Sequence, residues 1–201
     1  MTRIAAEESV ICLASMSPRR RELLAQIGVP HTVVAAHVDE RLLPGESPPD
    51  YVARLARLKA TAVLERAEPL PVLAADTTVV VEGAVYGKPA DRADGLAMLA
   101  ALAGRTHQVL TAVALATSRG VALRINCSSV TFRDIGRAEM EAYWETGEPR
   151  DKAGGYAIQG YGAVFVAALS GSYSGVMGLP LLETAQLLRD AGIHCWKGTA
   201  P

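Results

Sequence analysis

The sequence predicts an α/β protein with a mixed, twisted sheet and flanking helices, and the order of its apolar segments is the reason. In the first half, short apolar runs alternate with amphipathic segments, which is typical of parallel βαβ units. Two long β-rich runs follow at 107–117 and 121–133, joined by a short turn, and these favour antiparallel pairing. A sheet that contains both arrangements is mixed.

The first expected unit is a strand followed by a helix. Residues 10–14 form a short apolar run of the kind found in buried strands. Ser17 suits the N-cap because its side-chain oxygen accepts an unpaired backbone N–H, and Pro18 suits the next position because its fixed φ is helical. Gly28 provides the stop. The chain therefore enters its first helix directly from a buried strand.

Arg19, Arg20 and Arg21 fall in the first turn of this helix. The helix dipole disfavours cations there by roughly 0.3–1 kcal/mol each at low salt. A helix N-terminus with free N–H groups and nearby arginines is what a phosphate site needs. We therefore expect an anion site here; the alternative is three solvated arginines.

The remaining elements follow in chain order. On the second helix, Tyr51, Leu55, Leu58 and Ala62 are expected to share the buried face, with Lys59 outside it. The expected elements are a strand over 32–36, a helix from Ser47 or Asp50, a strand over 72–75, a hairpin over 79–86, a helix from Asp91 to Gly104, the two long strands, a helix over 137–146, a strand over 163–169 and a helix from Pro180.

Composition narrows the class of protein. Of the 201 residues, 50% are hydrophobic and 20% charged, and the formal net charge is −1, which argues against a general binder of nucleic acid or of anionic membranes. No signal-peptide core and no apolar run of about 18 residues occurs, so we expect no membrane association. Three widely spaced cysteines suggest reduced thiols and a cytoplasmic location. We expect one domain over 1–201, with 1–9 and 193–201 as peripheral tails.

Polar residues at the ends of apolar segments are the candidate site. Asp76 follows the 72–75 strand, the usual place for a site residue in an α/β sheet, although an Asx turn explains it equally well. With Glu40, which alone resembles a solvated turn, it would offer oxygen ligands to Mg²⁺. Lys59 and Lys88 are candidates to meet phosphate. A helix lysine is usually solvated, whereas Lys88 lies on a stiff Gly-Lys-Pro turn.

The glycine-rich segment 151–160 is the second candidate. Glycines let backbone approach a ligand closely, and Gln159 offers both a donor and an acceptor. The alternative is a flexible loop, but alternating Tyr156 and Ile158 suggest order. His107 and Trp144 are expected to be structural.

Taken together, these segments resemble the Maf family of nucleoside triphosphate pyrophosphatases. Single pieces are weak, but they occur in the family order from about Ile11 to Ala191. The matching pieces are Ala14-Ser15-Met16-Ser17-Pro18-Arg19-Arg20, Val38-Asp39-Glu40, Leu55-Ala56-Arg57-Leu58-Lys59-Ala60, Ala75-Asp76-Thr77, Gly87-Lys88-Pro89, Asp151-Lys152-Ala153-Gly154-Gly155-Tyr156 and Gly178-Leu179-Pro180-Leu181.

The resemblance implies an ITPase-like fold of the Maf/Ham kind, with two lobes around a cleft, and a homodimer. It implies hydrolysis of a nucleoside triphosphate between the α- and β-phosphates, with Mg²⁺ or another divalent cation such as Mn²⁺. Asp76 matches the proton acceptor and, with Glu40, the metal site. The positions that match residues lining the phosphate, metal and base sites are Ser15, Arg19, Arg20, Lys59, Thr77, Lys88 and Gln159.

Within the family, Arg19, Thr77 and Gln159 match the branch associated with dTTP and UTP, with modified pyrimidine nucleotides as a further possibility. Two alternatives stay open. One is the 7-methyl-GTP branch, which departs from the present sequence at these positions. The other is a nucleotide-binding inhibitor of septum formation and cell division without essential catalysis, which the intact Asp76, Glu40 and Lys88 set disfavours.

Overall fold

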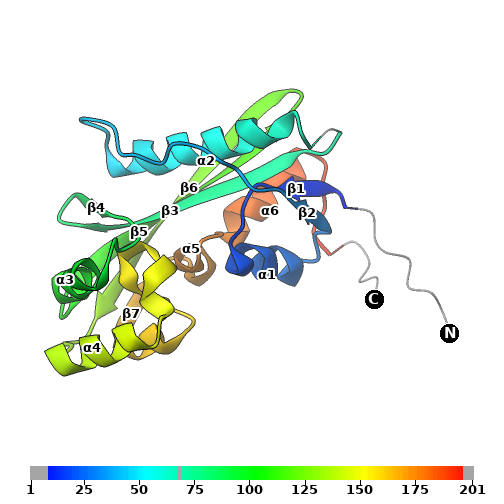
Figure 1. Cartoon of the computed structure of the whole chain (residues 1–201). Helices are drawn as coiled ribbons and strands as arrows, with labels where there is room; N and C mark the ends of the chain where they lie inside the picture. Colours follow the sequence, from blue (N-terminus) through cyan, green and yellow to red (C-terminus); the bar gives the residue numbers. More distant parts are fainter. Residues whose placement is uncertain (1–8, 68, 197–201) are drawn as a thin grey trace.

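A mixed sheet of seven strands forms the centre of the computed structural model, which describes residues 9–67 and 69–196 (Figure 1). The strands are β1 (Ile11–Leu13), β2 (His31–Val33), β3 (Val72–Val81), β4 (Ala84–Tyr86), β5 (Thr106–Thr117), β6 (Gly120–Phe132) and β7 (Val166–Ser170). Their order is β2-β1-β3-β5-β6-β7, with β4 also paired to β3. Pairing is parallel among β2, β1 and β3 and antiparallel elsewhere, which confirms the predicted mixed sheet.

Helices cover both faces of this sheet. They are α1 (Pro18–Gln26), α2 (Pro48–Leu64), α3 (Arg92–Leu102), α4 (Arg137–Glu145), α5 (Tyr173–Met177) and α6 (Leu181–Asp190). Because neighbouring residues of a strand point to opposite faces, β3 serves both layers. Val72 and Ala74 pack in the cluster under α2, whereas Leu73 and Ala75 pack with α1 and α6. None of the described helices is long and apolar enough to cross a bilayer.

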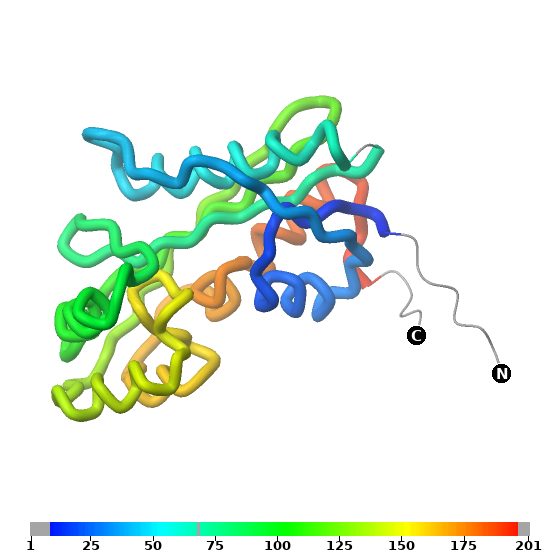
Figure 2. The backbone as a smooth tube through the Cα atoms, in the orientation of Figure 1, coloured from blue at the N-terminus to red at the C-terminus, as the bar shows by residue number. Residues whose placement is uncertain are grey.

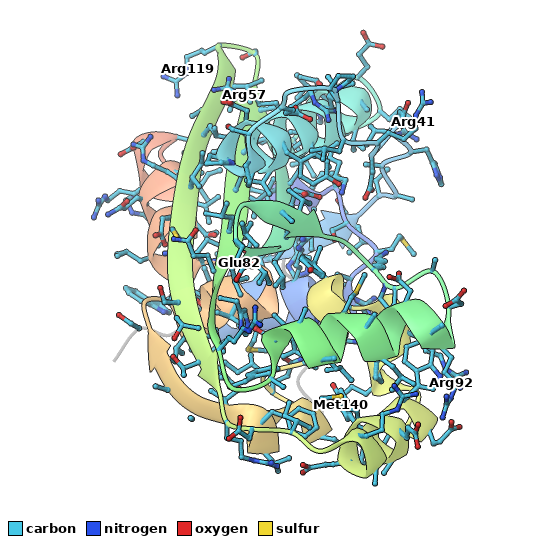
Figure 3. All side chains as sticks on the ribbon, turned by 90° about the vertical axis from the view of Figure 1, so that its left-hand side faces the viewer. Arg41, Arg57, Glu82, Arg92, Arg119 and Met140 are labelled. Atoms are coloured by element: carbon cyan, nitrogen blue, oxygen red, sulfur yellow. The ribbon has the colours of Figure 1, made fainter. Side chains whose placement is uncertain are left out.

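Two of these helices, α3 and α4, lie farther along the long strands. Figure 2 shows α3 and α4 side by side, at the end of the sheet away from α1. They close an aromatic cluster that contains Phe132, Tyr143, Trp144 and Phe165. Figure 3 shows the molecule turned by 90°, with Arg119, in the turn between β5 and β6, at the opposite end from α3 and α4, which carry Arg92 and Met140.

The buried face of α2 differs from the predicted one. The buried side chains are Val52, Leu55, Ala56, Lys59, Ala60 and Val63, whereas Leu58 and Ala62 are exposed. The prediction that Lys59 lies outside the buried face was therefore wrong. A lysine occupies this face because two carboxylates meet its ammonium group, as described below.

β3 also continues past the predicted strand end at Asp76. It pairs with β5 without interruption from Val72 to Val80, so Asp76 lies in mid-strand. On its other edge, β1 pairs only as far as Leu73, and β4 begins to pair at Val79. Among the described residues, no strand pairs with this edge of β3 between those two points. The gap exists because β1 ends at Leu13 and the chain turns away into α1.

Smaller differences concern helix and strand ends. Ser17 is the N-cap residue of α1, but its side chain makes no capping bond; the Oγ of Ser15 instead accepts the Ser17 N–H at 3.2 Å. The strand predicted over 163–169 is β7, and a 3-10 turn, Tyr161–Phe165, precedes it. The predicted N-terminal tail lies outside the described residues except for Ser9, as do residues 197–201 of the C-terminal one. Residues 193–196 return to α1, where the Trp196 N–H donates to the Ile27 carbonyl.

Candidate functional site

A cavity of about 560 Å³ opens at the gap in the sheet between β1 and β4. Its wall comes from the β1–α1 turn, α2, the exposed edge of β3, the turn after β4 and the 151–153 and 177–178 segments. All but one of the residues predicted for the site line it: Ser15, Arg19, Arg20, Glu40, Lys59, Asp76, Thr77 and Lys88. The topology therefore brings together residues that are far apart in the sequence.

Lys59 links the two predicted carboxylates. Its Nζ donates to Asp76 Oδ1 at 2.7 Å and lies 2.9 Å from Glu40 Oε1. Lys59 and Asp76 are buried, whereas the Glu40 side chain is half exposed. A buried charge is tolerated only when it is paired, so the two buried groups require one another. The ammonium also fixes the orientation of the Asp76 carboxyl group in the cavity.

The environment of Asp76 raises its pKa above the ordinary value. Burial is the main cause, because it disfavours the charged form. The nearby Lys59 ammonium and Arg20 guanidinium act in the opposite direction, and Glu40 adds a smaller upward contribution. A carboxylate with a raised pKa is a better proton acceptor than a solvated one. The site thus holds a carboxylate suited to general-base work.

Arg20 connects α1 to β3 and α5. Its Nε donates to the Gly178 carbonyl at 2.8 Å, its Nη2 to Thr77 Oγ1 at 3.2 Å and its Nη1 to Ser15 Oγ at 3.4 Å. Thr111, on β5, donates to Thr77 Oγ1 at 3.0 Å and so supports this network from behind. Burial lowers the pKa of Arg20, while Asp76 and Glu40 favour its charged form. Arg20 therefore contributes positive charge to the cavity from a fixed position.

Arg19 and Lys88 approach the cavity with more freedom. Arg19 Nη1 lies 3.9 Å from Asp151 Oδ2, a long ion pair with an exposed partner. Lys88 is exposed, and its ammonium has no hydrogen bond or ion pair with the described part of the chain. Both cations can thus reach a ligand without breaking a strong contact.

The comparisons with known proteins agree with this geometry. A family model described as Maf-like protein matches residues 10–191. The chain belongs to the Maf family. It is 56% identical over 193 residues to the dTTP/UTP pyrophosphatase of Saccharophagus degradans, covering 94% of this chain and 92% of that protein. It is 52% identical over 197 residues to the dTTP/UTP pyrophosphatase of Cupriavidus metallidurans, covering 92% and 98%.

A solved structure is also similar to this Maf protein. It is the Ham1 protein of Staphylococcus aureus, with a TM-score of 0.44 and 17% sequence identity. The likeness covers 62% of this chain and 72% of that chain.

Gln159 is the one predicted site residue of this Maf protein that does not line the large cavity. It lies at a small adjoining pocket of about 40 Å³. Arg19, Ala153 and Met177 line both spaces, so the small pocket continues from the large one. A ligand that fills the large cavity can therefore extend one end toward Gln159.

Among the lining residues that were absent from the predicted site, two hold or pair with predicted ones. Tyr51 donates its hydroxyl to the Glu40 carbonyl at 2.9 Å and so holds the loop that carries Glu40. It was assigned only to the apolar face of α2, and its polar hydroxyl at the start of the helix was the available signal. Asp151 pairs with Arg19 and lies in the same glycine-rich segment that drew attention to Gln159.

The acidic residues of the cavity fit a magnesium ion shared with a substrate. In the part of the chain that the structure describes, no group of three or more His, Cys, Asp or Glu side chains is placed to hold a metal alone. Asp76 and Glu40 are joined through one ammonium group and line the same cavity. Mg²⁺ is usually held by one or two carboxylates, completed by phosphate oxygens and water. The cavity offers two such carboxylates, Asp76 and Glu40.

Proposed function

We propose that this protein hydrolyses nucleoside triphosphates between the α- and β-phosphates, with dTTP and UTP preferred, and releases a nucleoside monophosphate and pyrophosphate. The observation that carries the proposal is the cavity in which Lys59, Asp76 and Glu40 form one charged cluster beside Arg19, Arg20 and Lys88. The relatives named dTTP/UTP pyrophosphatase, which match over nearly the whole chain, support it.

The cations of the cavity suit a triphosphate. A nucleoside triphosphate carries about four negative charges at neutral pH, and charge-assisted hydrogen bonds from lysine and arginine bind such groups well. Arg20 offers charge from a fixed position, and Arg19 and Lys88 can adjust to the phosphate chain. Mg²⁺, or another divalent cation such as Mn²⁺, would be held by Asp76 and Glu40 and would supply further charge neutralisation.

The hydrolytic step needs a base and a leaving group. Asp76 accepts a proton from the attacking water as the water oxygen forms a bond to the α-phosphorus. The bond between the α-phosphorus and the α,β-bridging oxygen breaks, and pyrophosphate leaves with the electron pair. Lys59 keeps the Asp76 carboxyl group oriented for this step, through the 2.7 Å hydrogen bond to Oδ1. Preorganised charge around the phosphates stabilises the transition state without later rearrangement.

The proposal also covers the setting of the enzyme. The cysteines of the described chain, Cys12, Cys127 and Cys195, are free thiols, which supports a reducing compartment such as the cytoplasm. We further propose a homodimer, as the family resemblance implies; sedimentation velocity of the purified protein tests this.

The decisive experiment is a substrate panel. Pyrophosphate release from dTTP, UTP, CTP, GTP, ATP and 7-methyl-GTP is measured with Mg²⁺, with Mn²⁺ and with a chelator. We expect metal-dependent release that is fastest with dTTP and UTP. Preference for 7-methyl-GTP would reject the assigned specificity, and nucleotide binding without release would reject the enzyme in favour of a binding protein.

A further inference from the structure

Gln159 lies on a short segment that two side chains hold at both ends. The Tyr143 hydroxyl, on α4, accepts the Ala157 N–H at 3.1 Å, two residues before Gln159. The Glu148 carboxylate accepts the Tyr161 N–H at 2.9 Å and the Gly162 N–H at 3.0 Å, just after it. Backbone N–H groups on both sides of Gln159 thus donate hydrogen bonds to the Tyr143 and Glu148 side chains.

The two side chains also bind one another. The Tyr143 hydroxyl donates to Glu148 Oε1 at 2.7 Å, so phenol and carboxylate form one unit. Burial and the adjacent carboxylate raise the pKa of Tyr143, which keeps the hydroxyl protonated and able to donate. Tyr143 is itself buried and meets Phe165 edge to face at 5.0 Å between ring centroids. The Tyr143–Glu148 pair, here called the anchor, thus joins a core tyrosine to a partly buried carboxylate.

The close approach of backbone to this anchor depends on two glycines. A Cβ added at Gly160 would overlap Oε2 of Glu148, and one at Gly162 would lie 2.8 Å from the Tyr143 hydroxyl. Only glycine leaves room for the carboxylate and the hydroxyl to reach the backbone here. The Gln159 side chain is exposed, and its amide has no hydrogen bond with the described residues. A held backbone thus presents a free amide at the edge of the small pocket.

We propose that Tyr143 and Glu148 are positioning residues that fix Gln159 and thereby set the preference for uracil and thymine over cytosine. This inference rests on the proposed function. Uracil and thymine present a carbonyl acceptor beside an N–H donor, and cytosine presents the reverse pair, so discrimination requires that the backbone carrying the Gln159 amide stays in one place. A recognition group must be held within about 0.5 Å of its productive position, and loosening its support weakens selectivity. Among the described residues, Arg20, Lys59 and Asp76, on α1, α2 and β3, make no hydrogen bond with this anchor.

The test compares Glu148→Gln with Glu145→Gln, an identical change three residues earlier on an exposed side chain that pairs with Arg92. An amide retains one acceptor oxygen and loses the other, so Glu148→Gln leaves part of the Tyr143, Tyr161 and Gly162 set unbound. We expect the ratio of kcat/KM for UTP to that for CTP to fall by about tenfold, the factor that 1.4 kcal/mol gives. The fall comes mainly from a higher KM for UTP, with CTP hydrolysis nearly unchanged. Glu145→Gln keeps the wild-type ratio.

Two further variants separate positioning from folding. Tyr143→Phe removes only the hydroxyl and should lower the UTP-to-CTP ratio in the same direction. In a Gln159→Ala background, which has already lost the amide, Glu148→Gln should produce no additional fall, because its effect passes through Gln159. Circular dichroism and thermal melting establish which variants are folded. If Glu148→Gln does not fold, the UTP-to-CTP ratio of Tyr143→Phe decides the test.

The outcomes distinguish the inference from the function on which it rests. A wild-type protein that hydrolyses none of the nucleotides overturns the proposed function and this inference with it. A wild-type protein that prefers UTP, with an unchanged ratio in the folded anchor variants, overturns the inference alone. An equal fall for UTP and CTP, or an undiminished effect in the Gln159→Ala background, would show a merely structural role and would also overturn it.

Discussion

Three consecutive arginines in the first turn of α1 have three different environments, although the sequence presents them alike. Arg20 is held by three hydrogen bonds within the site, Arg19 lines the cavity beside an exposed Asp151, and Arg21 is exposed and does not line the cavity. All three oppose the helix dipole. The positive charge of Arg19 and Arg20 is thus placed where binding of an anion would offset the unfavourable position.

This difference leads to a prediction for Arg19→Ala. Hydrogen bonds to charged groups contribute about 1.5–3 kcal/mol, so the variant should lose roughly ten- to a hundredfold in kcat/KM for UTP. The melting temperature should stay the same or rise slightly, because the long pair with Asp151 is weak and the dipole penalty disappears. Kinetics and calorimetry of Arg19→Ala and of the control Arg21→Ala check this. A large drop in melting temperature with unaffected kinetics would make Arg19 structural.

Asp76→Asn tests the proposed base. Asparagine has nearly the same shape but neither accepts the proton nor carries the charge, and loss of a general base typically costs about 10²–10⁴-fold in rate. The matched control is Asp39→Asn, an exposed aspartate beside Glu40 that pairs with Arg41 outside the cavity. Because Glu40 still pairs with the Lys59 ammonium, we expect folded proteins in both cases and normal turnover only in the control. Turnover like that of the wild type in folded Asp76→Asn would contradict the mechanism.

At the scale of elements, local patterns predicted which segments are strands and helices better than they predicted what those segments bury. The apolar spacing identified α2, but its buried face includes Lys59, because a distant carboxylate on β3 compensates for burying the charge. The β3 strand extends past Asp76, because pairing with β5 decides its length. The anchor of Gln159 had no detectable signal, because the Tyr143 and Glu148 side chains bind backbone N–H groups 13 or 14 residues farther along the chain.

The contact between α3 and α4 gives a prediction whose sign is informative. Glycine inside a helix ordinarily costs about 0.5–1 kcal/mol relative to alanine, so Gly95→Ala should stabilise α3 on local grounds. A Cβ at Gly95 would, however, overlap the Trp144 ring. Overpacking a core costs about 1–3 kcal/mol, and we therefore expect a net loss of stability. That loss should lower the melting temperature by a few degrees, since about 1 kcal/mol shifts a chain of this size by roughly 2–4 °C.

Calorimetry of Gly95→Ala in two backgrounds checks this prediction. In a Trp144→Leu background the steric conflict is removed, and the same substitution should become neutral or stabilising. The exposed site Ala97, on the same helix, gives the local propensity through Ala97→Gly. A higher melting temperature for Gly95→Ala in the wild-type background would contradict the packing seen here.

For the molecule as a whole, the site forms at the gap along β3 between its pairing with β1 and its pairing with β4, where separate segments of the chain meet. The resemblance of the ordered motifs to the Maf family predicted which residues belong together, and nearly all of them meet in one cavity. It did not predict how they meet. Asp76 faces Lys59 on the α2 side of β3, and Thr77 faces Arg20 on the other, so the cavity draws on both layers of the fold. That depends on β1 ending early, which only the assembled sheet reveals.

The last prediction concerns the stability of the whole chain in acid. His107 is 2% exposed; its Nε2 shares a hydrogen bond of 2.8 Å with the Tyr156 hydroxyl, and its Nδ1 has no partner among the described residues. Burial lowers the pKa of His107 from 6.5 to about 4, and Tyr156, the titratable group facing it, stays neutral because burial raises its pKa. The unfolded chain therefore binds a proton more readily than the folded one between pH 6.5 and 4.

Neutral His107 thus contributes stability that is fully present above pH 6.5 and is lost as the pH falls from 6.5 toward 4. At pH 5, about 1.5 units below the unfolded pKa, the loss should be on the order of 2 kcal/mol. Urea unfolding at pH 7.5 and pH 5 measures it. His107→Gln keeps a polar group near Tyr156 but does not titrate, so its unfolding free energy should fall less over this range, whereas the exposed control His37→Gln should follow the wild type. Equal losses in the wild type and in His107→Gln would show that His107 is not the group responsible.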